Sequence, residues 1–462
     1  MVRSAKERAR EYYQIATWAF IGLAALYSIL LRIYLAWDLP LWLDESWTAV
    51  LSAAPDLRTF VDYMWTDINA PFYFLLMWLW PVESDLGLRI PSFIFLLAAA
   101  LIVVLWRPSA VRRDTAFVWA ALLLLWQPGI GLFIDARYYA LLMLLCTAQT
   151  ITFIKLLDEP TLKRACWWTG LATLAVTTHY YAALPALIQG LVYILHHRIA
   201  AARTWPALLL VLPGACWGVY HLPRLLAFAD PKVAWYSVLQ LSDLPHLLSW
   251  PFAINWIAAL CLAALIAVFF SRERIDSSVR MAVAASFLAL ACFILLGFLR
   301  PLMMDRYLIP VVPALLLGVA SALRPAGYMP VVASFFVTMG SPVEWTQRVE
   351  NLRWFGLQLP ARELPHAKRV TWVFDYEKPS ILEAERRELD AVLVDAFKRS
   401  GRVIEASYGG DLTAGDGLIW LNPPKGELLA KVETEWNCKS FDGGGFSTVV
   451  CSHPIPSQVQ GR

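Results

Sequence analysis

Eleven long runs of apolar residues recur along the chain, and they constrain its fold more than any other feature of the sequence. A helix needs about 20 apolar residues to cross the hydrocarbon core of a bilayer. The runs lie at about 14–36, 90–106, 115–134, 138–157, 165–179, 180–195, 204–221, 250–270, 281–299, 306–323 and 328–340. We expect each run to form a membrane-spanning helix, although 165–179 and 180–195 are short for a span and 328–340 is the weakest candidate.

The composition agrees with a protein of the bilayer. Of the 462 residues, 59% are hydrophobic and only 16% are charged, whereas soluble proteins carry about 25% charged residues. The chain has 22 tryptophans and 17 tyrosines, and both residue types gather at membrane–water interfaces. The formal net charge of +3 is spread over many short loops and forms no basic stripe, so we exclude a nucleic-acid partner.

The N-terminus and the segment 70–82 decide the expected topology. The basic sequence MVRSAKERAR precedes a run too long for the core of a cleaved signal peptide, so we expect an anchor that stays in the protein. The thirteen apolar residues of 70–82 suit an interfacial or re-entrant helix. If this segment does not cross, most loop arginines and lysines lie on the side of the N-terminus. The positive-inside rule then predicts eleven spans in the inner (plasma) membrane, with a cytoplasmic N-terminus and an extracytoplasmic C-terminus.

The composition changes after about residue 340, so we divide the chain into a transmembrane domain at 1–340 and an extracytoplasmic domain at 341–462. The first outer loop of the transmembrane domain is 37–89. The second domain has β-like runs at 370–374 and in VIEASY and GLIWL, and the helical pattern of ILEAERRELDAVLVDAFKRSG ends at Gly401. The expected fold class is therefore mainly α: a polytopic helical bundle with a small C-terminal α/β domain.

Two cysteines of the C-terminal domain flank a turn sequence. Cys438 and Cys451 lie on either side of FDGGGF, which is typical of a hairpin. A disulfide between them agrees with an oxidising compartment outside the cytoplasm. We expect the tail after His453 to be disordered.

The first outer loop contains the sequence LWLDESW, with the adjacent carboxylates Asp44 and Glu45 between two tryptophans. One interpretation is a helix N-cap with a solvated neighbour. The other is a general base held at the membrane surface, where a low dielectric strengthens its interaction with a hydroxyl proton.

Charged and aromatic residues recur at other outer helix boundaries. LRIPS contains Arg89, IDARYYALLML contains Asp135 and Arg137, THYYAALPAL contains His179 and Tyr180, and MDRYLIPVVPALLLG contains Arg306 and Tyr307. A single arginine in such a place is usually an interfacial anchor, and we expect replacement of Arg224, which lies in no such motif, to have little effect on activity. Three arginines at one membrane face, beside paired carboxylates, favour a binding site.

This ordered set of motifs resembles the membrane glycosyltransferases of the GT-C superfamily, and most closely the group of protein mannosyltransferases and aminoarabinose transferases. The resemblance rests on LDE, APFYFLL, RIPS, DARYYALL, THYYAAL and DRYLIPVVPAL, and covers about residues 14–320. Two positions depart from the family pattern, since Ala70 replaces the first of two prolines and Asp135 replaces a glutamate. These changes leave the class intact and leave the substrate open.

The resemblance implies an inverting transfer of a sugar from a polyprenyl-phosphate donor to an extracytoplasmic lipid, glycan or protein. Asp44 matches the family's base, and Glu45 is a positioning residue or an alternate base. Arg306, Arg137 and Arg89, in that order, are the candidates for binding the donor phosphate, because guanidinium groups bind phosphate oxygens bidentately. His179, Tyr180, Tyr307 and Asp135 are candidates for the sugar pocket.

We expect no cofactor other than the donor substrate. The sequence has no Walker or Rossmann signature, and a lipid carrier that supplies its own leaving phosphate needs none. Asp44, Glu45 and Asp67 could together ligate a divalent metal, but the resemblance implies a metal-independent reaction. The remaining partners are membrane lipids and the acceptor.

Two other functions fit a polytopic protein. A transporter or lipid flippase would show internal repeats and charged or helix-breaking residues near the bilayer midplane. In this sequence no repeat is evident and the polar motifs collect at one membrane face. A structural or assembly protein would need only membrane anchors, which leaves the motifs unexplained.

The expected topology can be measured with reporter fusions. A reporter that is active only outside the cytoplasm should be active when fused after Ser341 and inactive when fused after Arg113, because the positive-inside rule places these two positions on opposite sides. The opposite pair of activities would mean that 70–82 spans the membrane.

Overall fold

We describe the fold from a computed structural model of the chain. The structure describes residues 5–37, 39–82, 84–229, 238–252, 261, 275–300, 303–353, 358–374, 383–409, 415–421, 423, 432–443 and 446–452. The tail after residue 452 and most of the predicted run at 250–270 lie outside the described residues.

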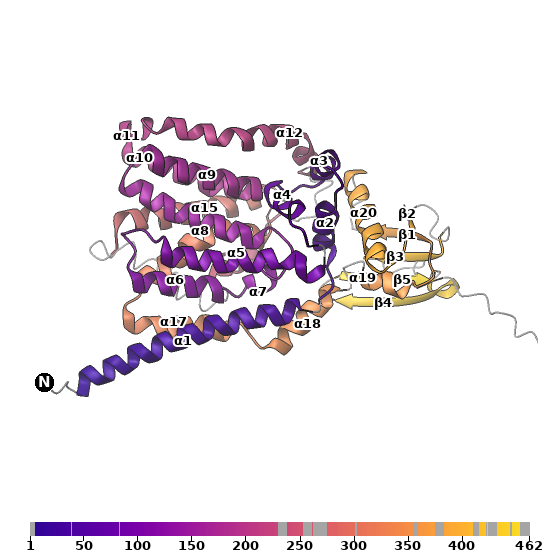
Figure 1. The fold of residues 1–462 in the computed structure, drawn as a ribbon, viewed down its shortest axis with the longest axis horizontal. Helices are drawn as coiled ribbons and strands as arrows, with labels where there is room; N and C mark the ends of the chain where they lie inside the picture. The colour runs from indigo at the N-terminus through magenta and orange to yellow at the C-terminus, as the bar shows by residue number, and fades with distance from the viewer. Residues whose placement is uncertain are drawn as a thin grey trace, which may run out of the picture.

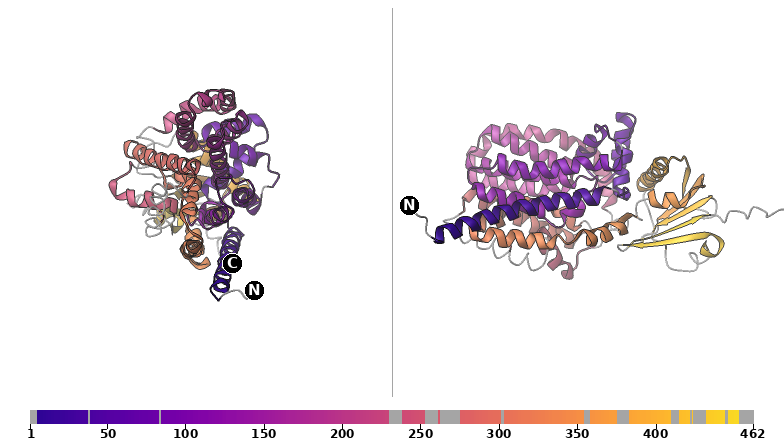
Figure 2. Two further views of the ribbon diagram at one scale, coloured as in Figure 1. Left: turned by 90° about the vertical axis from the view of Figure 1, so that its left-hand side faces the viewer. Right: turned by 60° about the horizontal axis from the view of Figure 1, so that its bottom comes forward.

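Long helices lie side by side and form a bundle, and the C-terminal domain lies at one end of it (Figures 1 and 2). The long helices are α1 (Ala5–Ala36), α5 (Asp85–Leu105), α6 (Arg113–Leu125), α8 (Tyr139–Asp158), α9 (Leu162–Thr178), α10 (Ala183–His197), α12 (Leu212–Phe228), α15 (Ser277–Leu299), α16 (Val312–Ala322) and α17 (Pro325–Thr338). The N-terminus lies at the opposite end of the bundle from the C-terminal domain (Figure 1).

Short helices connect the long ones. They are α2 (Leu43–Ser52), α3 (Leu57–Thr66), α4 (Phe72–Trp78), α7 (Gly129–Leu132), α11 (Ile199–Ala202) and α13 (Leu244–Ser249), with 3-10 segments η1 (Tyr180–Ala182), η2 (Trp205–Val211), η3 (Leu241–Asp243), η4 (Trp250–Phe252) and η5 (Asp305–Val311). Helices α2, α3 and α4 lie at the end of the bundle that faces the C-terminal domain (Figure 1). We call this the site end.

Six helices of the described chain are long and apolar enough to cross a membrane. They are Glu11–Ala36, Asp85–Leu105, Tyr139–Asp158, Trp205–Phe228, Ser277–Leu299 and Asp305–Ala322. Four further expected spans are also helical, but their helices, α6, α9, α10 and α17, are shorter than these six. The mainly helical membrane fold is confirmed, while the count of eleven spans stays a prediction.

The first outer loop forms three short helices, and two of them, α3 and α4, begin at a residue suited to that place. The Asp56 side chain accepts a hydrogen bond from the backbone N–H of Thr59, at 2.8 Å, and begins α3. Pro71 precedes α4, where its missing N–H costs nothing. Helix α4 has only seven residues, which agrees with a segment at 70–82 that does not cross the membrane.

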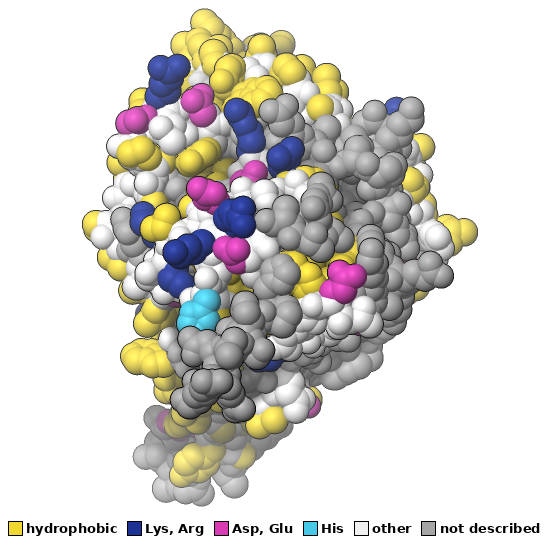
Figure 3. Space-filling model, turned by 90° about the vertical axis from the view of Figure 1, so that its right-hand side faces the viewer, with side chains coloured by type: hydrophobic (Ala, Val, Ile, Leu, Met, Phe, Trp, Pro, Cys, Tyr) yellow, Lys and Arg dark blue, Asp and Glu magenta, His cyan; other side chains and the backbone are white. Residues whose placement is uncertain are grey.

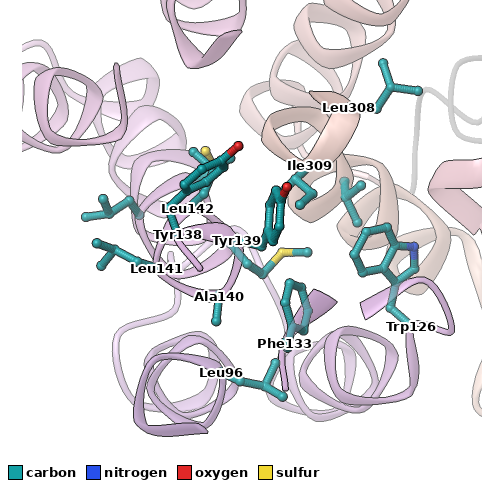
Figure 4. Packing of buried hydrophobic residues seen from close by; sticks show 14 of the residues in the cluster. Leu96, Trp126, Phe133, Tyr138, Tyr139, Ala140, Leu141, Leu142, Leu308 and Ile309 are labelled. Atoms are coloured by element: carbon teal, nitrogen blue, oxygen red, sulfur yellow. The ribbon is translucent and has the colours of Figure 1, made fainter. Parts of the chain in front are cut away.

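The core of the bundle near the site end is aromatic. Figure 4 shows Tyr138 and Tyr139 at the start of α8 packed with Leu96, Phe133 and Ile309 from neighbouring elements. These side chains are buried and belong to one continuous hydrophobic cluster. Helix α8 therefore lies at the centre of the bundle, and its first turn lies at the site end.

The C-terminal domain is a five-stranded sheet with helices. Its elements are α18 (Pro342–Arg353), α19 (Gln358–Glu363), β1 (Arg369–Phe374), α20 (Glu383–Arg399), β2 (Glu405–Tyr408), β3 (Gly417–Leu421), β4 (Asn437–Gly443) and β5 (Phe446–Ser452), with strand order β2-β1-β3-β5-β4. Strand β1 is parallel to β2 and β3, whereas β5 is antiparallel to β3 and β4. Gly401 follows α20 with a φ of 76°, which is a backbone conformation that favours glycine.

The hairpin of β4 and β5 contains the two cysteines. Cys438 and Cys451 are directly opposite each other in the antiparallel register and are joined in a disulfide. The remaining five cysteines of the chain are free thiols. The disulfide therefore joins β4, which lies at the edge of the sheet, to its neighbour β5.

Candidate active site

The carboxylate of Glu45 is bound on all sides by the protein. Arg89 donates two hydrogen bonds to it, from Nε to Oε1 at 2.7 Å and from Nη2 to Oε2 at 2.6 Å. The backbone N–H of Ala136 donates to Oε1 at 2.7 Å, and that of Trp42 donates to Oε2 at 3.2 Å. Both side chains of the ion pair have a relative exposure of 0%. This pair joins α2 to α5 and to the segment before α8.

Arg89 has no remaining capacity for a substrate. Besides Glu45, its guanidinium donates to the backbone carbonyl oxygens of Ala36 at 3.4 Å, of Pro40 at 3.1 Å and of Leu39. A phosphate could reach this group only by displacing these partners. The structure therefore places Arg89 and Glu45 in a buried structural pair, and we withdraw the expectation that Arg89 binds phosphate and that Glu45 is an alternate base.

Asp44, the residue before Glu45, faces in a different direction and remains accessible. Its side chain has a relative exposure of 27%. Successive helical residues are separated by about 100° around the axis, so adjacent carboxylates on α2 cannot share one environment. Asp44 lies in the first turn of α2, where the helix dipole favours a negative charge.

Arg137 holds Asp44 in place. Its Nη2 lies 3.4 Å from Oδ2 of Asp44, and its Nη1 donates to the Asp44 backbone carbonyl at 3.1 Å. The guanidinium also lies 5.0 Å from the ring centroid of Tyr138, a cation–π contact. Its Nε is buried and has no hydrogen-bond partner among the described residues. Arg137 can thus orient Asp44 and still donate to a further group.

Arg306 comes from η5, on the other side of the same space. It interacts electrostatically with Asp44 and with Tyr138 and Tyr139. Its Nε is also buried without a hydrogen-bond partner in the described chain. The site thus combines one accessible carboxylate with two arginines that each keep an unused buried donor. These are the features needed to bind an anion beside a base.

Aromatic rings pack beside the two arginines. The ring of His179 lies 4.9 Å from the ring of Tyr138 and 4.9 Å from that of Tyr307. His179 is buried, and its Nδ1 accepts a hydrogen bond of 3.4 Å from the backbone N–H of Tyr181. The structure therefore brings His179 and Tyr307 together at the site in packed positions. Asp135 is half-buried and interacts electrostatically with Glu45 and Arg89.

Tyr180 belongs to a second polar cluster on the side of α12. Its hydroxyl lies 2.7 Å from Nδ1 of His221 and accepts a hydrogen bond of 2.8 Å from Nε1 of Trp217. Asp67 is buried nearby at the end of α3, where it accepts a 3.1 Å hydrogen bond from Nε1 of Trp47. The sequence alone gave no signal for His221 or Trp217, because both lie within an ordinary apolar helix.

Arg224, whose replacement we expect to have little effect on activity, is buried in the structure. Its side chain is only 3% exposed, and its Nε donates to the backbone carbonyl of Thr66 at 2.8 Å. It belongs to the edge of the site between α12 and α3. In the described chain, no group of three or more histidine, cysteine, aspartate or glutamate side chains is placed to hold a metal ion.

Comparison with known proteins identifies the fold. Neither a protein-family model nor a curated protein matches the sequence. Among solved structures, ArnT from Cupriavidus metallidurans bound to undecaprenyl phosphate matches over 94% of this chain and 98% of its own, with a TM-score of 0.54 and 14% identity. The same enzyme in the apo state matches over the same shares, with a TM-score of 0.54 and 12% identity.

The fold is thus that of the solved ArnT structures. The similarity to ArnT includes the C-terminal domain, since it covers nearly the whole of both chains.

The buried pair predicts a large loss of stability when one partner is removed. Arg89→Ala leaves the Glu45 carboxylate buried without its counter-charge, which costs about 3–5 kcal/mol. Thermal unfolding in detergent should show a strongly lowered midpoint or a failure to accumulate folded protein.

The matched control is Arg112→Ala. Arg112 pairs with Asp114 at 2.6 Å, but its side chain is 70% exposed, so the loss should be at most about 1 kcal/mol. Equal losses from both variants would contradict a structural role for the Glu45–Arg89 pair.

Proposed function

We propose that the protein is an inverting glycosyltransferase that moves a sugar from a polyprenyl-phosphate donor to an extracytoplasmic acceptor. The observation that carries this proposal is the accessible carboxylate of Asp44, held by Arg137 and facing Arg306 at one end of a GT-C fold. The solved ArnT structure contains undecaprenyl phosphate, which supports a lipid phosphate as the leaving group here.

The reaction would be a single displacement. A hydroxyl oxygen of the acceptor attacks the anomeric carbon of the donor sugar and forms the new glycosidic bond. The bond between the anomeric carbon and the phosphate oxygen breaks, and its electron pair stays on the lipid phosphate. The acceptor proton passes to Asp44. Attack from the face opposite the leaving group inverts the anomeric configuration.

Arg306 and Arg137 would stabilise the charge that develops on the leaving phosphate. Each keeps a buried N–H donor without a partner among the described residues. A donor fixed in a site of low dielectric needs no reorganisation as negative charge develops, so it lowers the barrier more than a solvated cation does. Because Arg137 also contacts Asp44, it would couple the position of the base to that of the phosphate.

The direction of approach follows from the arrangement of the site. The lipid tail of the donor must remain in the bilayer, so its phosphate reaches the arginines from the membrane side. The acceptor then approaches from the site end, where α2 presents Asp44. We place this end outside the cytoplasm, from the charge bias of the loops. No cofactor is needed in this reaction.

The role of Asp44 can be tested by removing its basicity alone. Asp44→Asn retains the shape and a hydrogen-bonding side chain, so folding and affinity for undecaprenyl phosphate should be nearly unchanged. Turnover at saturating donor should fall about a hundredfold or more, the range for loss of a general base. Normal turnover of this variant would place the base elsewhere.

The role of Arg306 predicts a different pattern. Arg306→Ala removes a desolvated contact to phosphate worth about 2–4 kcal/mol, so both turnover and affinity for undecaprenyl phosphate should fall more than tenfold. Arg58→Ala is the control, because Arg58 is exposed on α3 at the same end of the protein. If both variants show the same small effect, Arg306 is an interfacial anchor.

A further inference from the structure

Helix α20 of the C-terminal domain covers part of the candidate active site. It packs against α2, which carries Asp44, and against α3, which ends at Asp67 (Figure 1). Figure 3 shows the end of the molecule with this domain toward the viewer, where acidic and basic side chains lie intermixed. The acceptor side of the site is therefore bounded by a domain that begins about 300 residues after Asp44 in the chain.

One face of α20 is polar and directed at the transmembrane domain. Glu388, Asp395 and Arg399 recur at spacings of seven and four residues, which places them on the same side of a helix. Arg399 lies 3.3 Å from Asp85, the first residue of α5, and 2.6 Å from Asp395. This ion pair ties the end of α20 to the bundle and fixes the direction in which its polar face points.

Glu388 lies at the other end of that face. Its side chain is half-buried. Its carboxyl group interacts electrostatically with Asp67, Asp44, Arg137 and Arg224, so it lies near charged residues of the transmembrane domain. Among the described residues, no hydrogen bond or ion pair fixes Glu388 itself. It is thus a polar group presented to the site without a structural partner in this part of the chain.

We propose that Glu388 is an acceptor-binding residue that the C-terminal domain adds to the active site, and that it hydrogen-bonds a carbohydrate acceptor. This inference rests on the proposed function. The acceptor is the partner that fits, because a carboxylate would repel the donor phosphate, which approaches from the membrane side. Glu388 and Asp44 come from different domains, so a molecule that meets both needs several hydroxyl groups. One hydroxyl would transfer its proton to Asp44 while another bonds Glu388.

The position of Glu388 makes the stability of the folded protein depend on pH, and this dependence can be measured without substrate. Burial, together with the carboxylates of Asp67 and Asp44, holds the pKa of Glu388 well above its usual range, against the opposite effect of Arg137 and Arg224. A carboxyl group whose pKa is raised by folding binds a proton more readily in the folded state. Its effect on stability is therefore most favourable below the unfolded-state pKa of about 4.3, and becomes unfavourable as the pH rises toward the folded pKa.

The test uses the full chain in detergent and three variants, Glu388→Gln, Glu388→Ala and the control Arg387→Gln. Arg387 is the exposed neighbour of Glu388 on α20. The first readout is the unfolding temperature. Glu388→Gln should match the wild type near pH 4 and exceed it by about 2 °C or more at pH 8, while Arg387→Gln should show no such divergence. Parallel curves for Glu388→Gln and the wild type would overturn the placement of Glu388 in the site.

The second readout is transfer of labelled sugar from undecaprenyl-phosphate monosaccharides to a cell-envelope extract. Both Glu388 variants should need about tenfold more extract for half-maximal transfer, with the half-saturating donor concentration unchanged. Unchanged extract dependence, or label that protease releases as glycopeptide, would overturn the proposal. The wild type serves as the comparison: if it transfers no label, the proposed function fails, whereas normal transfer by the Glu388 variants removes only this inference.

Discussion

The buried ion pair of Glu45 and Arg89 determines where the rest of the site can lie. It joins α2 to α5 and, through the backbone of Ala136, to the segment that precedes α8. Removing two charges from water is costly, and here the cost is offset by hydrogen bonds to every charged atom of the carboxylate. Because Glu45 is fixed, the next residue toward the N-terminus, Asp44, is fixed as well, with its side chain turned toward Arg137 and the accessible space.

Two adjacent acidic residues therefore have separate tasks. Glu45 is neutralised by a partner of its own and holds the helix in place. Arg137 contacts Asp44 and could also donate to a bound phosphate. The Asp44 carboxylate is therefore held in place but remains accessible. An arrangement with both carboxylates facing the site would oblige them to share a proton. Separate environments leave one carboxylate in a structural role and the other accessible to an acceptor hydroxyl.

The sequence predicted the elements of the fold better than the contacts of the site. The apolar runs, the short helix at 70–82, the strands of the C-terminal domain and the glycine after α20 all follow from local patterns, and the structure shows each of them in the described chain. Arg89 was proposed as a phosphate ligand because a motif cannot tell such a ligand from a buried structural arginine. Glu388 could not be identified, because its place at the site depends on how two domains pack.

The position of α20 also has a consequence for the order of events during synthesis. Asp44 is among the first residues made, whereas α20 and the cysteine-linked hairpin are among the last. A chain arrested before its final hundred or so residues, a length of roughly one domain, would already contain Asp44, Arg137 and Arg306, but not the helix that packs against α2. If Glu388 forms part of the acceptor side, as proposed, folding of the C-terminal domain would be the step that completes the site.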